Sequence, residues 1–126
     1  MSFASNLLTK RPEVELLDCT LREGSYAVDF NFDEGFVSYL LANLNESRIP
    51  RVEIGHGIGL EAERAGAKAD SIHHHRWCEL ANSALTDKPW GMFAQPEFTR
   101  LETIADMARR GIHDEGARHL HLGLAH

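Results

Sequence analysis

The chain has 126 residues, of which 43% are hydrophobic and 25% are charged, and its formal net charge is −6 at pH 7. This composition is typical of a globular protein, and the length predicts a single domain over residues 1–126 with a sizeable core. Because the sequence has no apolar run that could cross a bilayer and no basic cluster that could follow a phosphate backbone, we expect neither a membrane nor a nucleic acid as a partner.

Two further features of the sequence concern the compartment. No uninterrupted apolar stretch precedes Lys10-Arg11, so we expect no cleaved secretory signal and predict a cytoplasmic location. Cys19 and Cys78 are far apart and form no CxxC pair, which favours reduced, packed thiols over a zinc knuckle or a disulfide framework.

The first half of the chain alternates strand-like and helix-like segments. Residues 14–19 predict a strand, and Asp33 is an N-cap candidate for an amphipathic helix. The apolar side chains of this helix recur at helical spacing: Phe36, Val37, Leu40, Leu41 and Leu44. Ile49-Pro50 interrupts the helix, and residues 51–55 predict a second short strand.

The next segments continue the alternation. Residues 60–70 indicate a mobile polar segment, after which Ser71 can cap a helix. One face of this helix carries Trp77, Ala81, Ala84 and Leu85, whereas His73-His74-His75 points in three directions and is interpreted as a polar face. Residues 90–94 predict a third strand.

The last segments predict a helix and a strand. Thr99 and Glu102 have the spacing of a capping box, ahead of apolar residues at helical spacing: Leu101, Ile104, Ala105 and Ala108. Gly116 is the preferred end of this helix, which leaves residues 117–123 as a fourth strand. With no hairpin signal between strands, the order predicts an α/β fold with a parallel sheet.

The stretch LLDCTLREGSYAVDFNF, residues 16–32, resembles the first strand and loop of the metal-dependent pyruvate-family aldolases and lyases. The usual pattern of that family is D-x-T-L-R-D-G-S/E. The resemblance is to the 4-hydroxy-2-oxovalerate aldolase branch, which is related to hydroxymethylglutaryl-CoA lyase and isopropylmalate synthase. Residues 52–60, 90–94 and 116–123 look like the second, third and fourth strands of the same fold.

This resemblance implies half of a TIM barrel, with about four strands and three helices against the eight strands of a complete barrel. A half-barrel leaves two parallel sheet edges open, and proteins normally cover or pair such edges. We therefore expect a homo-oligomer or a partner chain that completes the barrel, unless the sequence is a fragment.

The resemblance also implies roles for two neighbouring motif residues. Arg22 would neutralise the enolate oxygen of pyruvate, because an arginine stays protonated and can hold keto-acid oxygens in a fork. Glu23 stands where the family has Asp and would bind a divalent metal, Mn²⁺ or Mg²⁺. The alternative is an ion pair between Arg22 and Glu23.

Two residues are candidates for proton transfer. Tyr26 stands where the aldolase branch usually has a histidine base; a phenol is a poor base near neutrality but can orient a substrate or act as a weak acid. His56 follows the second strand in a glycine-flanked turn and could supply the base. The alternatives are an aromatic lid for Tyr26 and a histidine bonded to its own loop for His56.

The family completes its metal site with a His-x-His pair on a later strand. His119 and His121 have that spacing on the fourth predicted strand, and alternation would put both imidazoles on one face. We therefore list them with Glu23 as candidate metal ligands.

Two functional hypotheses follow. The first is a divalent-metal-dependent C–C lyase, an aldolase that acts on a 4-hydroxy-2-keto acid through a pyruvate enolate. The second is a non-catalytic half-barrel, a subunit or a degenerate paralogue that binds a partner through its open sheet edges. A condensing enzyme of the synthase branch has less support, because Ser25-Tyr26 replaces the Glu-Gln expected after the motif glycine.

Overall fold

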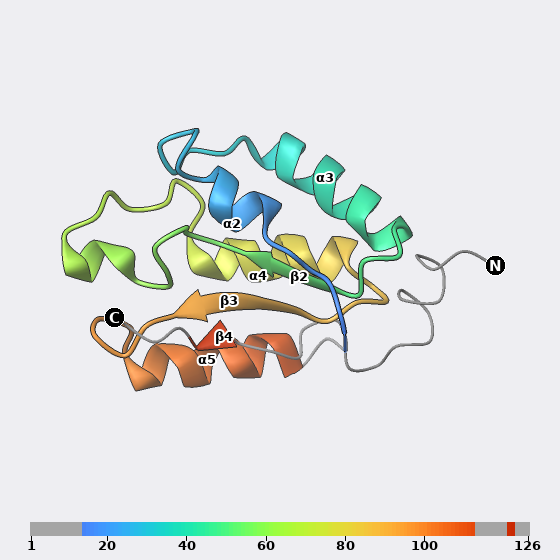
Figure 1. Cartoon of the computed structure of the whole chain (residues 1–126). Coiled ribbons are helices and arrows are strands. Elements are labelled where there is room, and N and C mark those ends of the chain that lie inside the picture. The colour runs from blue at the N-terminus through green and yellow to red at the C-terminus, as the bar shows by residue number, and fades with distance from the viewer. Residues whose placement is uncertain (1–13, 113–120, 123–126) are drawn as a thin grey trace.

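The computed structural model describes residues 14–112 and 121–122. Within these residues, short parallel strands alternate with helices (Figure 1), which confirms the predicted α/β class of a partial β/α barrel. Part of the predicted fourth strand, including His119, lies outside the described residues.

The strands of the described residues form one parallel sheet in the order β1-β2-β3-β4. Their bounds are Leu17–Asp18 for β1, Arg51–Ile54 for β2, Trp90–Ala94 for β3 and His121–Leu122 for β4. The third strand coincides with its predicted range, whereas the first is shorter than predicted. Asp18 lies opposite Val52, and Ile54 lies opposite Met92, so the carboxyl ends of β1, β2 and β3 meet at one edge.

The helices are α2 (Thr20–Gly24), α3 (Glu34–Glu46), α4 (His74–Ala84) and α5 (Leu101–Ile112), with a short 3₁₀ helix η1 (Ala62–Ala65). Asp33 caps α3 as predicted, because its carboxylate accepts a hydrogen bond of 3.0 Å from the backbone N–H of Phe36. In the described residues, no helix has the length and apolar character that a membrane span requires.

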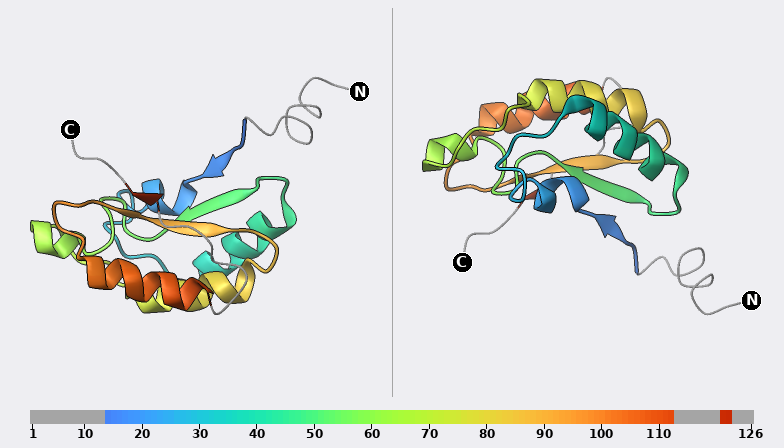
Figure 2. Two further views of the ribbon diagram at one scale, coloured as in Figure 1. Left: turned by 90° about the horizontal axis from the view of Figure 1, so that it is seen from below. Right: turned by 90° about the horizontal axis from the view of Figure 1, so that it is seen from above.

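The sheet has two different faces. Helices α3, α4 and α5 lie on one face, whereas α2 lies on the opposite side (Figure 2). Val52 and Ile54 of β2 join the hydrophobic core under the helices, together with Trp77, Leu41 and Met92. Since side chains alternate along a strand, Glu53 projects from the other face, where α2 lies.

Residues 60–70 differ from the predicted mobile polar segment. They include η1, and Leu60 and Ala62 are buried. Glu61 is also buried and forms an ion pair with Arg100 at 2.6 Å. These contacts attach the start of the segment to the rest of the protein, whereas residues 63–66 are exposed, so the segment is only partly the polar excursion that was predicted.

The start of α4 also differs from the prediction. The N-cap is His73 rather than Ser71: its backbone is extended and its Nδ1 accepts a hydrogen bond of 3.1 Å from the backbone N–H of His75. An imidazole thus performs the capping that a serine hydroxyl usually performs. This detail places the three consecutive histidines at the very start of the helix.

The predicted capping box and buried face of α5 are not those of the structure. The Thr99 hydroxyl accepts from the backbone N–H of Gln95 and donates to the carbonyl of Leu60 at 2.7 Å. Thr103 and Met107 are buried, whereas Leu101 is 80% exposed. The helix is therefore rotated relative to the face that its apolar residues predict.

Candidate functional site

The motif residues after β1 fold into helix α2. Asp18, at the end of β1, accepts hydrogen bonds from the backbone N–H of Thr20 at 3.0 Å and from its hydroxyl at 2.9 Å. These bonds start the helix directly at the carboxyl end of the strand, and Leu21 is buried beneath it. The helix therefore holds Arg22 beside the sheet.

Arg22 lies between two glutamates. Its Nε is 2.6 Å from Oε1 of Glu53, its Nη2 is 2.6 Å from Oε1 of Glu23, and its Nη1 donates to the carbonyl of Gly57 at 3.3 Å. The Nε–H is not directed at the Glu53 carboxylate, so that contact is an ion pair rather than a hydrogen bond. Because only 16% of the Arg22 side chain is exposed, the guanidinium is held in place with little water around it.

Phe93 supports the guanidinium from β3. The Arg22 guanidinium carbon is 4.5 Å from the centroid of the Phe93 ring, a cation–π contact. Glu53 pairs with Gly91 in the register between β2 and β3, and alternation places Phe93 on the same face as Gly91. Arg22 is thus fixed by two neighbouring strands on the face of the sheet away from α3, α4 and α5.

Glu53 is a residue of the candidate site that the sequence analysis missed. Its side chain is 2% exposed, and it lies in β2 between the buried residues Val52 and Ile54. A carboxylate inside a short apolar strand was the available signal, because a buried charge requires a charged or hydrogen-bonding partner. The structure identifies Arg22 as that partner.

The predicted His-Gly loop after β2 packs directly on the motif. The backbone N–H of Gly57 donates to the Ser25 hydroxyl at 2.9 Å. A Cβ at Gly57 would lie 2.4 Å from a ring carbon of Tyr26 and 2.7 Å from the Ser25 hydroxyl oxygen. Only glycine therefore fits at this position. Gly57 also joins the loop to the motif, because its N–H binds Ser25 and its carbonyl accepts a hydrogen bond from Arg22.

His56 is buried, with 7% of its surface exposed. Its Nδ1 accepts from the backbone N–H of Ile58 at 3.0 Å, so Nε2 carries the proton and donates to the carbonyl of Lys68 at 2.7 Å. The ring also stacks on Phe30 at a centroid distance of 3.9 Å. Since both nitrogens hold backbone groups, this geometry favours a role in shaping the loop over a role as a proton acceptor.

Tyr26 is placed differently from His56. Its side chain is 51% exposed, and its ring packs edge-on against Phe30 at 5.4 Å. It also borders Gly57, whose carbonyl accepts a hydrogen bond from Arg22. The structure thus brings Arg22, Tyr26 and the His56 loop together at the carboxyl ends of β1 and β2.

The predicted metal ligands are less completely placed. Glu23 is 61% exposed and paired with Arg22, His119 lies outside the described residues, and His121 is described only by its backbone, opposite Phe93. Among the described side chains, no group of three potential metal ligands includes Glu23. The described residues therefore do not complete a Mn²⁺ or Mg²⁺ site.

Both cysteines are free thiols, as predicted. Cys19 lies 3.7 Å from Oε1 of Glu53, and burial, together with the negative charge of Glu53, raises the pKa of its thiol. Burial raises the pKa of Cys78 to about 12. Neither thiol is activated as a nucleophile, because only the thiolate is strongly nucleophilic.

A cavity of about 90 Å³ lies behind the His56 loop, between the ends of β2 and β3 and the start of α4. Its polar lining includes His56, Glu61, Asp70, His73 and His74. Burial, followed by the neighbouring imidazoles of His73 and His75, lowers the pKa of His74 to about 4. Imidazoles and carboxylates thus share a small, partly enclosed space next to the Arg22 site.

Comparisons with known proteins find no matching family model, but they find curated relatives. The chain is 33% identical over 90 residues to an oxaloacetate decarboxylase of Mycobacterium tuberculosis, a match that covers 71% of this chain and 26% of that protein. It is 30% identical over 92 residues to a 4-hydroxy-2-oxovalerate aldolase of Streptomyces tendae, covering 72% of this chain and 26% of that protein. An aldolase of the same name from Spirochaeta aurantia is 27% identical over 93 residues, which cover 74% of this chain and 27% of that protein. The chain thus spans about a quarter of the length of the relatives it matches.

Proposed function

Because this chain is a homologue of oxaloacetate decarboxylase and of the 4-hydroxy-2-oxovalerate aldolases, we propose that it carries the enolate-stabilising part of a C–C lyase site. The substrate class is a 2-oxo acid that loses a group from C3. Arg22 is the residue that would hold the oxygen on which negative charge develops.

The reactions that the names of these two kinds of relative describe have one step in common. Loss of CO₂ from oxaloacetate and loss of an aldehyde from 4-hydroxy-2-oxovalerate both break the bond between C3 and C4 of a 2-oxo acid. The electron pair of that bond moves onto the remaining fragment, which is the enolate of pyruvate. A site that stabilises this enolate therefore serves either reaction.

The position of Arg22 is the observation that carries the proposal. Its contacts with Glu53, Glu23 and Gly57 involve Nε and one N–H of each terminal nitrogen. Each terminal nitrogen of a guanidinium has two N–H groups, so Arg22 keeps a donor on each for the oxygens of a keto acid. A guanidinium already fixed by an ion pair and an aromatic ring needs little rearrangement when charge develops.

Tyr26 is the better placed of the two candidates for proton transfer. Half of its side chain is exposed beside the Arg22 site, whereas both nitrogens of His56 hold backbone groups. We assign Tyr26 to orienting the substrate or protonating the enolate, and His56 to holding the loop that contacts Arg22. The metal site formed by Glu23, His119 and His121 stays a prediction, because the described side chains do not complete it.

The proposal is tested by exchange of the methyl protons of pyruvate in D₂O, followed by NMR with and without Mn²⁺. We expect exchange by the wild-type chain and a loss of about 100-fold or more in Arg22→Ala, because removing one oxyanion donor has an effect of that size in other enzymes. Arg51→Ala is the matched control, since Arg51 lies at the opposite end of β2 and pairs with Glu15 on the surface. Loss of oxaloacetate and of 4-hydroxy-2-oxovalerate is then measured with the same proteins.

An absence of exchange under every condition would overturn the catalytic proposal for this chain and favour the non-catalytic half-barrel. One observation supports that second candidate: Val14, Leu16 and Leu17, at the outer edge of the sheet, are all between 45% and 47% exposed. Such apolar side chains are suited to contact with another polypeptide. Recovery of exchange on adding a chain with the remaining strands would restore the catalytic proposal for the complex.

A further inference from the structure

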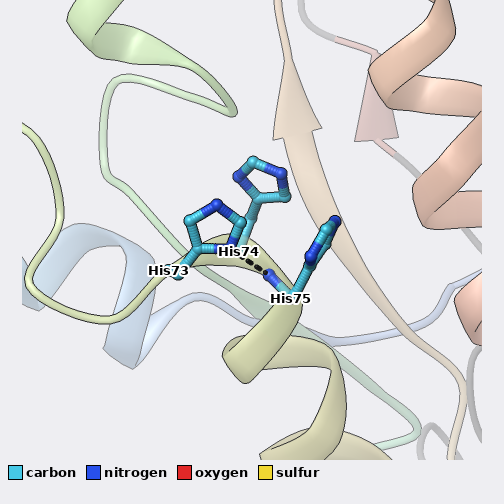
Figure 3. A group of neighbouring side chains, drawn as sticks. All are labelled: His73, His74 and His75. Atoms are coloured by element: carbon cyan, nitrogen blue, oxygen red, sulfur yellow. Dashed lines mark hydrogen bonds between the residues drawn. The ribbon is translucent and has the colours of Figure 1, made fainter.

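Three consecutive histidines gather at the start of α4, near the carboxyl end of the sheet (Figure 3). His73 is the N-cap, and His74 and His75 are the first two residues of the helix. The ring centroids of His73 and His74 are 4.0 Å apart, those of His73 and His75 are 4.7 Å apart, and those of His74 and His75 are 4.8 Å apart. One ring nitrogen from each can be chosen so that all three lie within 4.8 Å of one another.

The interpretation of these histidines as a polar face that spreads in three directions was therefore wrong. Three consecutive residues inside a helix do point in different directions, but His73 is not inside the helix. Its extended backbone, with φ −61° and ψ 147°, and its hydrogen bond to the backbone N–H of His75 fold its ring back over the first turn. The capping geometry is thus what brings the imidazoles together.

Asp106 provides a second, independent observation. Its Oδ2 lies 2.7 Å from Nε2 of His75, and the same oxygen accepts a hydrogen bond of 3.1 Å from Nε of Arg110. When Nε2 of His75 donates to this carboxylate, the lone pair of the imidazole is on Nδ1. A carboxylate that orients a histidine in this way is the usual support of a histidine bound to a metal.

We propose that His73, His74 and His75 form a binding site for a divalent transition metal such as Zn²⁺ or Co²⁺, next to the cavity behind the His56 loop. Imidazole nitrogens suit these ions, whereas Mn²⁺ and Mg²⁺ prefer oxygen ligands. The site is separate from the Glu23, His119 and His121 site that the sequence predicts, and it does not depend on the proposed lyase function.

Binding requires a small rearrangement. Metal–nitrogen bonds of about 2.0–2.1 Å place tetrahedral ligands about 3.3 Å apart, so the imidazoles must close by rotation of their side chains. His73 is exposed and His74 and His75 are half-buried, which leaves room for these rotations. His73 exchanges its cap hydrogen bond for a metal bond, so His74 and His75 are the stronger ligands.

The charges around the cluster partly compensate for the positive end of the α4 dipole. Asp106 is paired with His75, and the adjacent cavity is also lined by Glu61, Glu63 and Asp70. Glu61 is already paired with Arg100, and Asp70 accepts hydrogen bonds from the backbone N–H of Ile72 and from the indole of Trp77. Glu63 thus adds negative charge beside the ion, and the cavity provides space for a water molecule as a fourth ligand.

The test is titration of the full chain with Co²⁺ alone, followed by the visible absorption of the ion, and then displacement by Zn²⁺. We expect one ion per chain with absorption typical of tetrahedral coordination, and loss of this signal in the double variant His74→Gln/His75→Gln. Asp106→Asn leaves all three imidazoles in place and removes the carboxylate that orients His75 and pairs with Arg109 and Arg110, so we expect affinity to fall by about 10-fold or more. Circular dichroism of each variant verifies that it is folded.

The matched control is the double variant His119→Gln/His121→Gln, which removes two histidines of the other predicted site. We expect it to bind Co²⁺ as the wild type does. If the control loses the signal and the His74 and His75 variant keeps it, the metal belongs to the other pair and the proposal is overturned. Absence of any tetrahedral signal at a 10-fold excess of Co²⁺ would overturn it as well.

Discussion

Arg22 contacts two glutamates whose surroundings differ sharply. Glu53 is 2% exposed within β2, whereas Glu23 is 61% exposed on α2, and each has an oxygen 2.6 Å from an Arg22 nitrogen. Burial decides what each contact contributes, because water screens an exposed ion pair and hydrates whichever partner remains when the other is removed. The two pairs are equally short but not equivalent.

This difference gives a prediction at the scale of the residue. Glu53→Gln leaves the Arg22 guanidinium with no buried counter-charge and should lower the free energy of unfolding by about 2–3 kcal/mol. Glu23→Gln, the matched control on the same arginine, should lower it by less than about 0.5 kcal/mol. Urea unfolding followed by circular dichroism measures both. Equal effects of the two substitutions would contradict this account of Arg22.

The sequence identified Arg22 but not Glu53, for a physical reason. Arg22 belongs to a contiguous motif whose residues are also neighbours in space, so a pattern along the chain is sufficient to find it. Glu53 is 31 positions further along, and only the parallel pairing of β1 with β2 places it beside the arginine. His56 was found by its position after a strand, but the backbone bonds of its two nitrogens depend on loop geometry that no pattern predicts.

At the scale of the element, the start of α5 is fixed by contacts with Leu60 and Glu61, the two residues that precede η1. Glu61 accepts hydrogen bonds from the backbone N–H of Arg100 at 2.9 Å and from its guanidinium at 2.6 Å. Thr99 binds the carbonyl of Leu60. These polar contacts orient the helix, which explains why Thr103 and Met107 face the core and Leu101 does not. The apolar pattern alone could not reveal this, because it carries no information on contacts between elements.

The ion pair between Glu61 and Arg100 predicts a pH dependence. Burial alone would raise the pKa of Glu61, but hydrogen bonds from Arg100 and Thr103 outweigh it and lower the pKa. Because the folded-state pKa is below the unfolded one, the stabilisation is complete above the ordinary pKa of glutamate and is lost as pH falls from there through the lower folded-state pKa. Arg100→Gln should therefore lower the melting temperature by a few degrees at pH 7 and by less at pH 3.

Thermal unfolding at several pH values, followed by circular dichroism, measures this effect. Glu102→Gln serves as the control, because Glu102 is an exposed carboxylate only two residues from Arg100. The control should show a nearly constant, small difference from the wild type. A difference for Arg100→Gln that does not shrink at low pH would show that the pair acts through packing rather than through charge.

At the scale of the whole molecule, the two faces of the sheet are covered unequally, because among the described residues the short helix α2 is the helix on the face that carries Glu53 (Figure 2). The outer helices α3, α4 and α5 cover only the other face (Figure 2). The outward-facing apolar side chains are spread over several elements: Leu17 of β1 is 45% exposed, Phe36 and Tyr39 of α3 are 48% and 70% exposed, and Leu101 of α5 is 80% exposed. In a closed barrel, a neighbouring strand would pair with the sheet edge that carries Leu17, whereas the outer sides of the helices would stay at the surface.

We therefore predict that this chain associates with itself or with a polypeptide that has the remaining strands. Size-exclusion chromatography with light scattering should detect a dimer or larger species, and Leu17→Glu should shift it towards the monomer. Tyr39→Glu, on the outer side of α3, is the comparison variant that separates association through the sheet from association through the helices. A well-folded wild-type monomer at all concentrations would contradict the prediction of self-association.

The loop of residues 55–60 has a consequence for how the two candidate sites relate. On one side, Gly57 contacts Ser25 and accepts a hydrogen bond from Arg22; on the other, His56 and Gly59 line the cavity beside the histidines of α4. The loop thus separates the two sites and contacts both, and it has no room at Gly57 for an added carbon. If an ion bound at the histidines shifts this loop, the affinity of the Arg22 site for a 2-oxo acid changes. Thermodynamic linkage then requires that the acid change the affinity for the ion by the same factor.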